Sequence, residues 1–217
     1  VHVLRLEAAL EAWHRRHTSA SEAALERALG SLERVDPQHP MTEVARSFVQ
    51  GGKGQVAECI ERFTKILARD DLAPDLRAHV LMLRGWNEQL LERTGDAIRD
   101  LEAALHLAPA NGRVFAILAR SLCAASRCDE GLDRARQAVM LSPADVEGYT
   151  TLSYVQATLE QWNEAAAAAG RAFALAPSMT NGARYAVCLE AAGRKAEALA
   201  VAQKIEGRRN AAAARPP

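Results

Sequence analysis

The sequence predicts an all-α fold of stacked antiparallel helix pairs, and three repeating features support this prediction. Prolines recur every 34 residues, at Pro109, Pro143 and Pro177. An alanine precedes each of these prolines by five residues, and a leucine precedes each by two. Each block between prolines holds two apolar stretches with helical spacing, separated by a short polar break. A fixed period of this length is typical of stacked supersecondary units.

The first two blocks, residues 1–39 and 40–77, predict atypical helix pairs. The first contains a helix through Trp13, a break at HTSAS and a second helix before Pro37. In the second block, Phe63 lies on the second helix, and we expect Pro74 to close that helix because proline cannot continue the hydrogen-bond ladder. The terminal units of a stack commonly depart from its consensus, which accounts for these irregularities.

The three central blocks, residues 78–111, 112–145 and 146–178, predict the best-matched pairs. Their second helices carry small residues at i, i+4 and i+7, which form one stripe on a helix. Small side chains let a neighbouring backbone approach closely, so we expect tight helix packing there. The stripes are Ala97, Leu101 and Ala104, then Gly131, Ala135 and Ala138, then Ala165, Ala169 and Ala172, facing the small first-helix residues Gly85, Ala119 and Ser153.

A fourth pair is predicted over residues 179–207, followed by a flexible tail at 208–217. The stripe continues as Ala198, Ala202 and Ile205, although the connection has lost one residue relative to the preceding period. The sequence therefore predicts about six helix pairs in total.

The blocks that start near Ala78, Gly112 and Val146 resemble the tetratricopeptide repeat, a 34-residue helix-turn-helix unit. The resemblance rests on the small first-helix residue, the small residue that opens the second-helix stripe, and the terminal proline. Arg84 stands where the family usually has leucine, and we expect its charge to be turned outward to solvent. The resemblance implies a right-handed superhelical solenoid. The family's frequent tryptophan is replaced by Leu81, Phe115 and Tyr149.

The resemblance also implies a binding surface, since first helices of successive repeats line a concave groove in this family. A partner segment is expected to contact side chains of the interface-enriched types on that groove. An equally weighted alternative is that Trp86 and Tyr154 only fill space between neighbouring repeats. The candidate groove residues are His79, Met82, Trp86, Gln89, Arg113, Arg120 and Tyr154.

These features favour a non-catalytic protein-protein interaction scaffold or adaptor whose partner is a protein or peptide. Tetratricopeptide domains that grip a chaperone carboxyl terminus use a lysine and asparagines on the groove, and the corresponding positions here lack them. Two alternatives stay open: the repeat region of a larger multidomain enzyme or regulator, and a secretion-type chaperone for an apolar substrate.

Composition and motifs narrow the function classes further. The 27 basic residues balance 27 acidic residues, which argues against a nucleic-acid groove. No apolar run is long enough to predict a membrane span, and no phosphate loop or nucleophile elbow predicts an enzyme or a cofactor. The chain begins at Val1 with no signal-like segment, so a cytoplasmic location is the expectation, with a removed signal as the alternative.

Cysteine and histidine spacing predicts no metal site. The four cysteines show no CxxC spacing; they are Cys59, Cys123, Cys128 and Cys188. We expect each of them to be a small buried hydrophobic side chain, and a regulatory disulfide between Cys123 and Cys128 is the alternative. His14 and His17 at i, i+3 could share a helix face, but no third and fourth ligand lie nearby. We therefore expect residues 13–17, with the sequence WHRRH, to form a solvent-exposed basic helix face.

Overall fold

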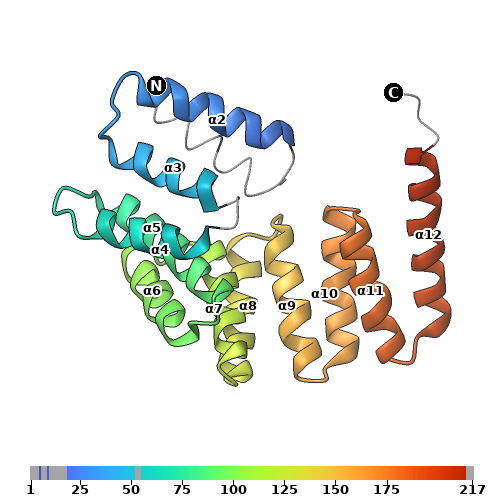
Figure 1. Ribbon diagram of the computed structural model, residues 1–217. Helices are drawn as coiled ribbons and strands as arrows, with labels where there is room; N and C mark the ends of the chain where they lie inside the picture. The colour runs from blue at the N-terminus through green and yellow to red at the C-terminus, as the bar shows by residue number, and fades with distance from the viewer. Residues whose placement is uncertain (1–4, 6–8, 10–18, 52–54, 214–217) are drawn as a thin grey trace. The chain divides into compact units, whose positions relative to one another are not determined.

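The computed structural model describes residues 5, 9, 19–51 and 55–213, and no strand occurs among them (Figure 1). This confirms the predicted all-α class. Two compact units divide the chain, Val1–Pro109 and Ala110–Pro217, and each is described by itself. The described helices of the first unit are α2 Ser19–Glu33, α3 Pro40–Gly51, α4 Val56–Leu67, α5 Pro74–Leu90 and α6 Thr94–Leu107. The second unit holds α7 Gly112–Ala124, α8 Cys128–Leu141, α9 Val146–Thr158, α10 Trp162–Leu175, α11 Met179–Ala191 and α12 Lys195–Ala213.

Helices that follow one another in the chain pack side by side within each unit. In the second unit, α7 also packs against α9, so two first helices are neighbours, as stacking of helix pairs requires. The periodic prolines act as expected, because α6, α8 and α10 each end two residues before Pro109, Pro143 or Pro177.

Pro74 corrects one prediction. It does not close α4, which already ends at Leu67, but is the first residue of α5. Proline suits this position because the first helical N–H has no intrahelical acceptor and the fixed φ of proline matches the helix. The helix pair α5–α6 therefore begins four residues before Ala78, where the sequence repeat was expected to start.

The turn inside each of four successive helix pairs has the same backbone geometry. One residue per turn has a positive φ, namely 58° at Glu92, 61° at Ser126, 58° at Glu160 and 78° at Gly193. The next residue donates its N–H to a carbonyl five residues back, as Gln161 does to Gln156 at 2.9 Å. This is the Schellman ending, in which the left-handed residue lets the backbone cap its own helix. Only the last of the four turns uses glycine, the residue that adopts this conformation without steric cost.

Glu160→Gly is therefore expected to raise the free energy of unfolding by up to about 1.5 kcal/mol. Relief of left-handed strain contributes about 1–2 kcal/mol, and the greater freedom of glycine in the unfolded chain offsets about 0.5–1 kcal/mol of it. Chemical denaturation measures the difference. Glu164→Gly, inside the first turn of α10, is the matched control and should destabilise. A Glu160→Gly protein that is less stable than the parent would contradict the assigned turn.

Side-chain caps start the first helices of the second unit. The Asn111 Oδ1 accepts from the backbone N–H of Arg113 at 3.1 Å, and the Asp145 Oδ1 accepts from that of Glu147 at 3.2 Å. The Ser178 Oγ accepts from the N–H of Asn181 at 3.1 Å. Each cap lies one or two residues after a periodic proline, so the sequence stops one helix and starts the next within a few residues.

The small residues lie where helices approach closely, as predicted. A Cβ added at Gly131 on α8 would lie 2.7 Å from the Ala119 carbonyl oxygen on α7, inside van der Waals contact. A Cβ at Gly85 on α5 would lie 3.1 Å from the Ala97 carbonyl oxygen on α6. Ala119, Ala97 and Ala138 are themselves buried. In both helix pairs, α5–α6 and α7–α8, the backbones therefore pack closer together than larger side chains would allow.

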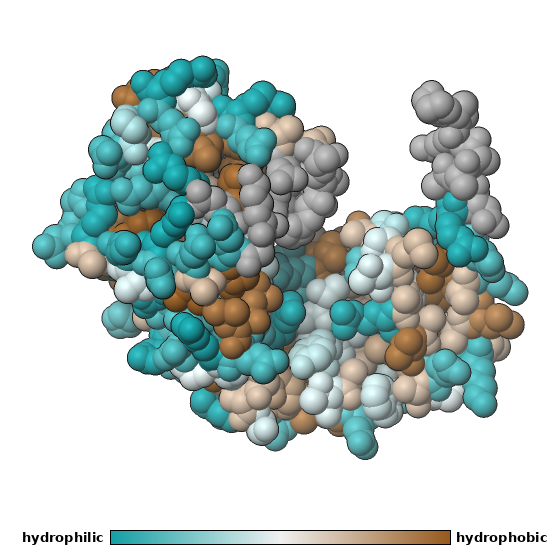
Figure 2. All heavy atoms as spheres, in the orientation of Figure 1, coloured by the Kyte–Doolittle hydropathy of each residue, from teal (hydrophilic) through white to brown (hydrophobic). Residues whose placement is uncertain are grey.

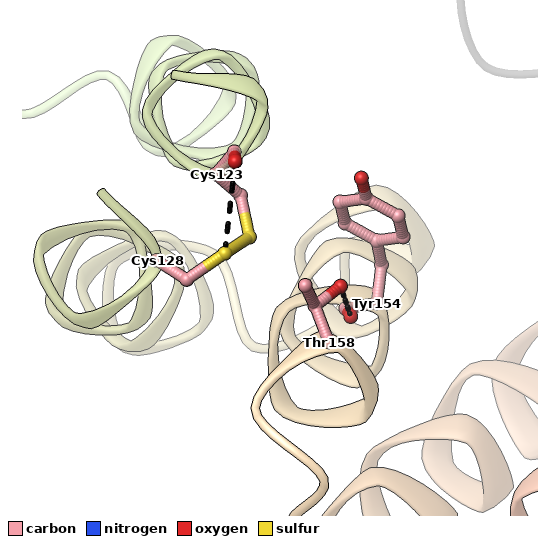
Figure 3. Close-up of a disulfide and its surroundings, with 4 residues drawn as sticks. All are labelled: Cys123, Cys128, Tyr154 and Thr158. Carbon is pink, nitrogen blue, oxygen red and sulfur yellow. Dashed lines mark hydrogen bonds between the residues drawn. A yellow bond between two sulfur atoms is a disulfide. The ribbon is translucent and has the colours of Figure 1, made fainter. Parts of the chain in front are cut away.

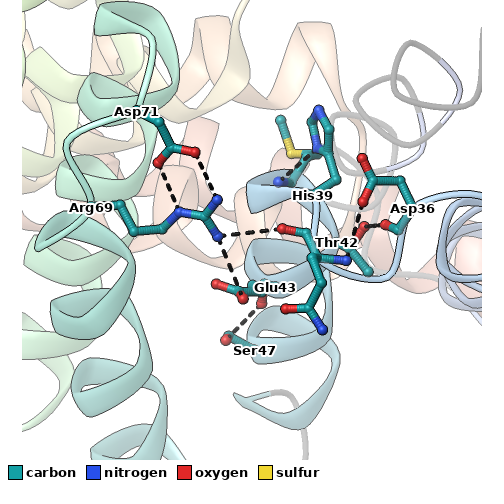
Figure 4. A network of polar contacts seen from close by, with 9 residues as sticks. Asp36, His39, Thr42, Glu43, Ser47, Arg69 and Asp71 are labelled. Atoms are coloured by element: carbon teal, nitrogen blue, oxygen red, sulfur yellow. Dashed lines mark hydrogen bonds and ion pairs between the residues drawn. The ribbon is translucent and has the colours of Figure 1, made fainter.

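In the first unit, Arg69 joins the loop before α5 to the segment around α3 (Figure 4). Its guanidinium binds both carboxylate oxygens of Asp71 at 2.9 Å, and the hydrogen bond lowers the pKa of that exposed carboxyl. The same side chain donates to the Gln38 carbonyl oxygen at 3.3 Å and lies 3.7 Å from the Glu43 carboxylate. Arg69 therefore orders a connection that is longer than the turns of the second unit.

Candidate functional site

In the first unit, the groove candidates lie on α5 and differ in their accessibility. Met82 is only 3% exposed, so it is a packing residue and offers a partner almost no surface. His79, Trp86 and Gln89 are half-buried. These three side chains are therefore the groove candidates of α5 that a partner could reach.

Arg84 on α5 corrects the expectation that its charge turns outward. Its guanidinium forms a two-pronged ion pair with the Asp100 carboxylate on α6, with Nε–Oδ2 2.5 Å and Nη2–Oδ1 2.7 Å. Its Nη1 also donates to the Thr64 Oγ1 on α4 at 3.1 Å. The Asp100 side chain is 9% exposed, and its hydrogen bond raises the pKa of the Arg84 guanidinium. The arginine thus connects three helices from within.

Glu88, one turn after Arg84, is a buried carboxyl group that sequence reasoning missed. The residue is 7% exposed, and its Oε2 makes no hydrogen bond. Burial raises its pKa to about 7, and the nearby Asp100 carboxylate adds to the rise while Arg84 opposes it. Asp96 and Arg99 on α6 are the other charged groups that act on it, in opposite directions. Ionising Glu88 therefore costs folding free energy.

The stability of the first unit should consequently depend on pH. Since the pKa of Glu88 is higher in the folded state than its ordinary value of 4.5, the folded state retains a proton that the unfolded state releases. The free energy of unfolding should fall by about 2 kcal/mol as the pH rises from about 5 to about 7.5. Glu88→Gln should remove this loss, whereas Glu102→Gln, exposed on α6, should keep it. Denaturant titrations across this pH range measure the slopes, and equal slopes in the parent and Glu88→Gln would refute the assignment.

In the second unit, the groove candidates lie on α7 and α9. The Arg113 Nε on α7 is 3.5 Å from the Glu147 Oε2 on α9, so this arginine already has an acidic partner in the next helix pair. Arg120 on α7 is exposed, and Tyr154 on α9 is 40% exposed. Neither of these two side chains has an ion pair or hydrogen bond to another described residue. Arg120 and Tyr154 are therefore the candidates that the fold leaves available.

Cys123 and Cys128 correct the expectation of free buried thiols, because they form a disulfide across the turn between α7 and α8 (Figure 3). The five-residue separation places one cysteine in the last turn of α7 and the other at the first residue of α8, with Cα atoms 4.1 Å apart. Tyr154 and Thr158 lie on the neighbouring α9 in the same view. Cys59 and Cys188 are buried free thiols, as expected.

Reduction of this disulfide is expected to lower the free energy of unfolding by about 2 kcal/mol, the loop-entropy value for so short a ring. Chemical denaturation with and without a reductant measures the difference. Cys123→Ser combined with Cys128→Ser should match the reduced parent and lose all sensitivity to the reductant. Cys188→Ser retains the bridge and controls for unrelated thiols. Equal stability of the oxidised and reduced parent would contradict the expected contribution.

A cavity of about 520 Å³ lies among α10, α11 and α12, and sequence reasoning did not single it out. Its lining combines apolar and aromatic side chains with two cations of α12. The available sequence signal was a basic pair with helical i, i+4 spacing, Lys204 and Arg208.

The described residues hold no group of three or more His, Cys, Asp or Glu side chains arranged to bind a metal ion. His14 and His17 lie outside the described residues. Within the described part of the chain, no helix has both the length and the apolar character needed to cross a membrane.

Comparison with known proteins identifies the fold. No protein-family model matches the chain, and no curated protein matches it. A crystal structure of MamA is similar, with a TM-score of 0.63 and 19% identity over 76% of this chain and 94% of the other. A thermophilic TPR protein from Thermus thermophilus, TTC0263, has a TM-score of 0.65 and 16% identity over 76% of this chain and 89% of the other.

A tetratricopeptide repeat protein from Parabacteroides merdae covers more of the chain. Its TM-score is 0.60 at 14% identity, over 94% of this chain and 80% of the other. At these identities the likeness concerns the fold, and it agrees with the repeated helix pairs, left-handed turns and small-residue contacts described above. The described helices therefore adopt a TPR-like fold of repeated helix pairs, similar to that of these solved structures.

Proposed function

We propose that this protein is a non-catalytic interaction scaffold that binds a segment of a protein partner along the exposed faces of its first helices. The observation that carries the proposal is the pair Arg120 and Tyr154. They lie on first helices that pack against each other, α7 and α9, and neither side chain makes an ion pair or a hydrogen bond with another described residue. Arginine and tyrosine are the residue types most enriched among side chains that dominate interface energy.

The chemistry of these two residues suggests the kind of segment that fits. Tyr154 offers an aromatic face and a hydroxyl, which suit an apolar side chain beside a polar group. Arg120 offers a planar donor set for a carboxylate or a backbone carbonyl. Arg113 contributes less in this proposal because Glu147 already neutralises it.

The test begins with identification of a partner by affinity capture and mass spectrometry, followed by calorimetric titration of variants. Tyr154→Ala should weaken binding by about 2 kcal/mol or more, roughly thirtyfold, as truncation of an interface aromatic commonly does. Arg120→Ala should cost about 1.5–3 kcal/mol through the lost charged hydrogen bond. The contribution of Arg120 should shrink with added salt.

Two matched variants on the second helix α8 serve as controls. Arg136→Ala removes an exposed arginine, and Met140→Ala removes an apolar side chain that is 80% exposed. Both should bind like the parent, and helical content should be unchanged in all four variants. Parental affinity in Arg120→Ala and Tyr154→Ala, with folding intact, would place the partner elsewhere and reject the proposal.

A further inference from the structure

The last helix pair, α11–α12, lacks an aromatic residue at a position that the two preceding pairs fill with one. Phe115 and Tyr149 occupy equivalent first-helix positions 34 residues apart, and the shortened fourth pair has Gly182 at the corresponding place. A Cβ added at Gly182 would lie 2.5 Å from the Ile205 Cδ1 and 3.0 Å from the Phe173 ring. Ile205 and Phe173 therefore pack tightly against Gly182, and Phe173 also lines the cavity.

Each second helix of the second unit, α8, α10 and α12, places a basic side chain over an aromatic ring. Arg134 lies over Phe115 at 6.0 Å, and Arg171 lies over Tyr149 at 5.8 Å. In the last pair Lys204, which follows Arg171 by 33 residues, lies 5.6 Å from the centroid of Phe173 instead. Lys204 therefore occupies the repeat position of Arg171 but lies over Phe173, a ring on a different helix from Tyr149.

The last pair differs in having a second cation on the same ring. Arg208, one turn after Lys204 on α12, lies 5.9 Å from the centroid of Phe173. Like charges at i, i+4 repel each other, and no carboxylate is among the described residues that line the cavity. Neither cation has an ion pair within the described part of the chain, and Arg208 donates only to the Pro177 carbonyl oxygen at 3.3 Å. An anionic group here would relieve the repulsion.

The remaining lining is apolar and aromatic. Phe173 and Tyr185 place their ring centroids 6.4 Å apart, and Ala174, Ala200 and Val201 complete the wall. Figure 2 shows apolar side chains among polar ones over α10, α11 and α12. On these helices, Met179 and Leu199 are about 60% exposed. The site therefore combines a place for one apolar side chain, two cations at its edge and an apolar surface along which a chain could extend.

We propose that this cavity binds a short acidic segment of a protein partner. The segment would insert one aromatic or aliphatic side chain against Phe173 and Tyr185, while an adjacent carboxylate meets Lys204 and Arg208. Charge complementarity selects an acidic rather than a basic segment, and the apolar wall selects a segment with a bulky side chain over a small inorganic anion. This site is separate in residues from the first-helix surface formed by Arg120 and Tyr154.

The test uses the full chain, labelled with ¹⁵N, and follows amide chemical shifts during peptide titrations. The probe is a seven-residue synthetic peptide with the sequence Gly-Ser-Asp-Phe-Asp-Ser-Gly and blocked ends. Saturable shifts are expected at the amides of Gly170, Ala174, Tyr185 and Ala200. A peptide with lysine in place of both aspartates, and one with serine in place of phenylalanine, should each bind at least about tenfold more weakly.

Variants of the protein then test the two cations. Lys204→Gln combined with Arg208→Gln should weaken binding of the acidic peptide at least about tenfold and abolish its salt dependence. Lys195→Gln, exposed at the start of α12, is the matched control and should bind like the parent. Arg120→Ala and Tyr154→Ala should also bind this peptide like the parent, so failure of the first-helix proposal would be visible separately.

Three results would overturn the proposal. The first is the absence of localised shifts at these amides, and the second is equal binding of the acidic and basic peptides. The third is a stronger effect of inorganic phosphate or AMP than of the acidic peptide on the same amides, which would assign the site to a phosphate ligand. If the double glutamine variant melts well below the parent, the salt dependence of peptide binding to the parent protein replaces it as the test. Weaker binding with added salt would support the role of the two cations, and unchanged binding would overturn it.

Discussion

Arg84→Leu is expected to lower the free energy of unfolding by about 3–5 kcal/mol, the range for breaking a buried ion pair from one side. The leucine itself fits, because Leu118 and Leu152 occupy the equivalent positions in the next two pairs. The loss comes from Asp100, whose carboxylate would remain buried without its guanidinium partner and close to Glu88. Equilibrium denaturation measures it directly.

The double variant Arg84→Leu with Asp100→Ala isolates this cause. It reproduces the leucine and alanine that the third central pair carries at Leu152 and Ala168, and it removes both charges. Replacing a buried ion pair by apolar residues is often neutral or stabilising, so the double variant should recover most of the loss. If both variants were equally unstable, packing rather than the unpaired carboxylate would explain the result.

Gly131→Leu is expected to cost about 3 kcal/mol, at the upper end for overpacking. The added Cβ alone would approach the Ala119 carbonyl oxygen to 2.7 Å, and a backbone atom cannot move aside as the end of a flexible side chain can. The two helices α7 and α8 would therefore have to separate. The midpoint of thermal unfolding, combined with denaturant titration, measures the effect.

Gly207→Leu is the matched control for this substitution. Gly207 lies inside the exposed helix α12, and nothing lies within 4 Å of an added Cβ. Leucine is a better helix former than glycine by about 0.5–1 kcal/mol, so this variant should be slightly more stable than the parent. Equal effects of the two leucines would show that α7 and α8 do not meet at Gly131.

Local chemistry explains why much of the fold could be predicted. Proline cannot continue a helix, so the 34-residue spacing of Pro109, Pro143 and Pro177 marked the ends of α6, α8 and α10. A stripe of alanine and glycine is useful only where a backbone comes close, so it marked the contact between paired helices. Pro74 was assigned wrongly because proline is equally compatible with the end of one helix and the first residue of the next.

The candidate sites were less predictable because they depend on partners distant in sequence. Met82 follows the same helical spacing as accessible groove residues, yet it is buried, since spacing assigns a face of the helix and not the depth of what covers it. Cys123 and Cys128 lack a recognised motif, and only the turn geometry brings their sulfur atoms together. The groove itself stays a prediction, with Arg120 and Tyr154 as its accessible members.

The helical class, the repeat length and the close-packing positions could be predicted from the sequence, because they follow from the conformational limits of single residues repeated at a fixed period. The pairing of charged side chains, in contrast, became known only from the three-dimensional arrangement of the helices. Arg84 pairs with Asp100, sixteen residues away on another helix, whereas no carboxylate is among the described residues that line the cavity with Lys204 and Arg208. Electrostatic energy depends on the distance between charged groups and on their exposure to water, and the spacing of a sequence repeat gives neither quantity.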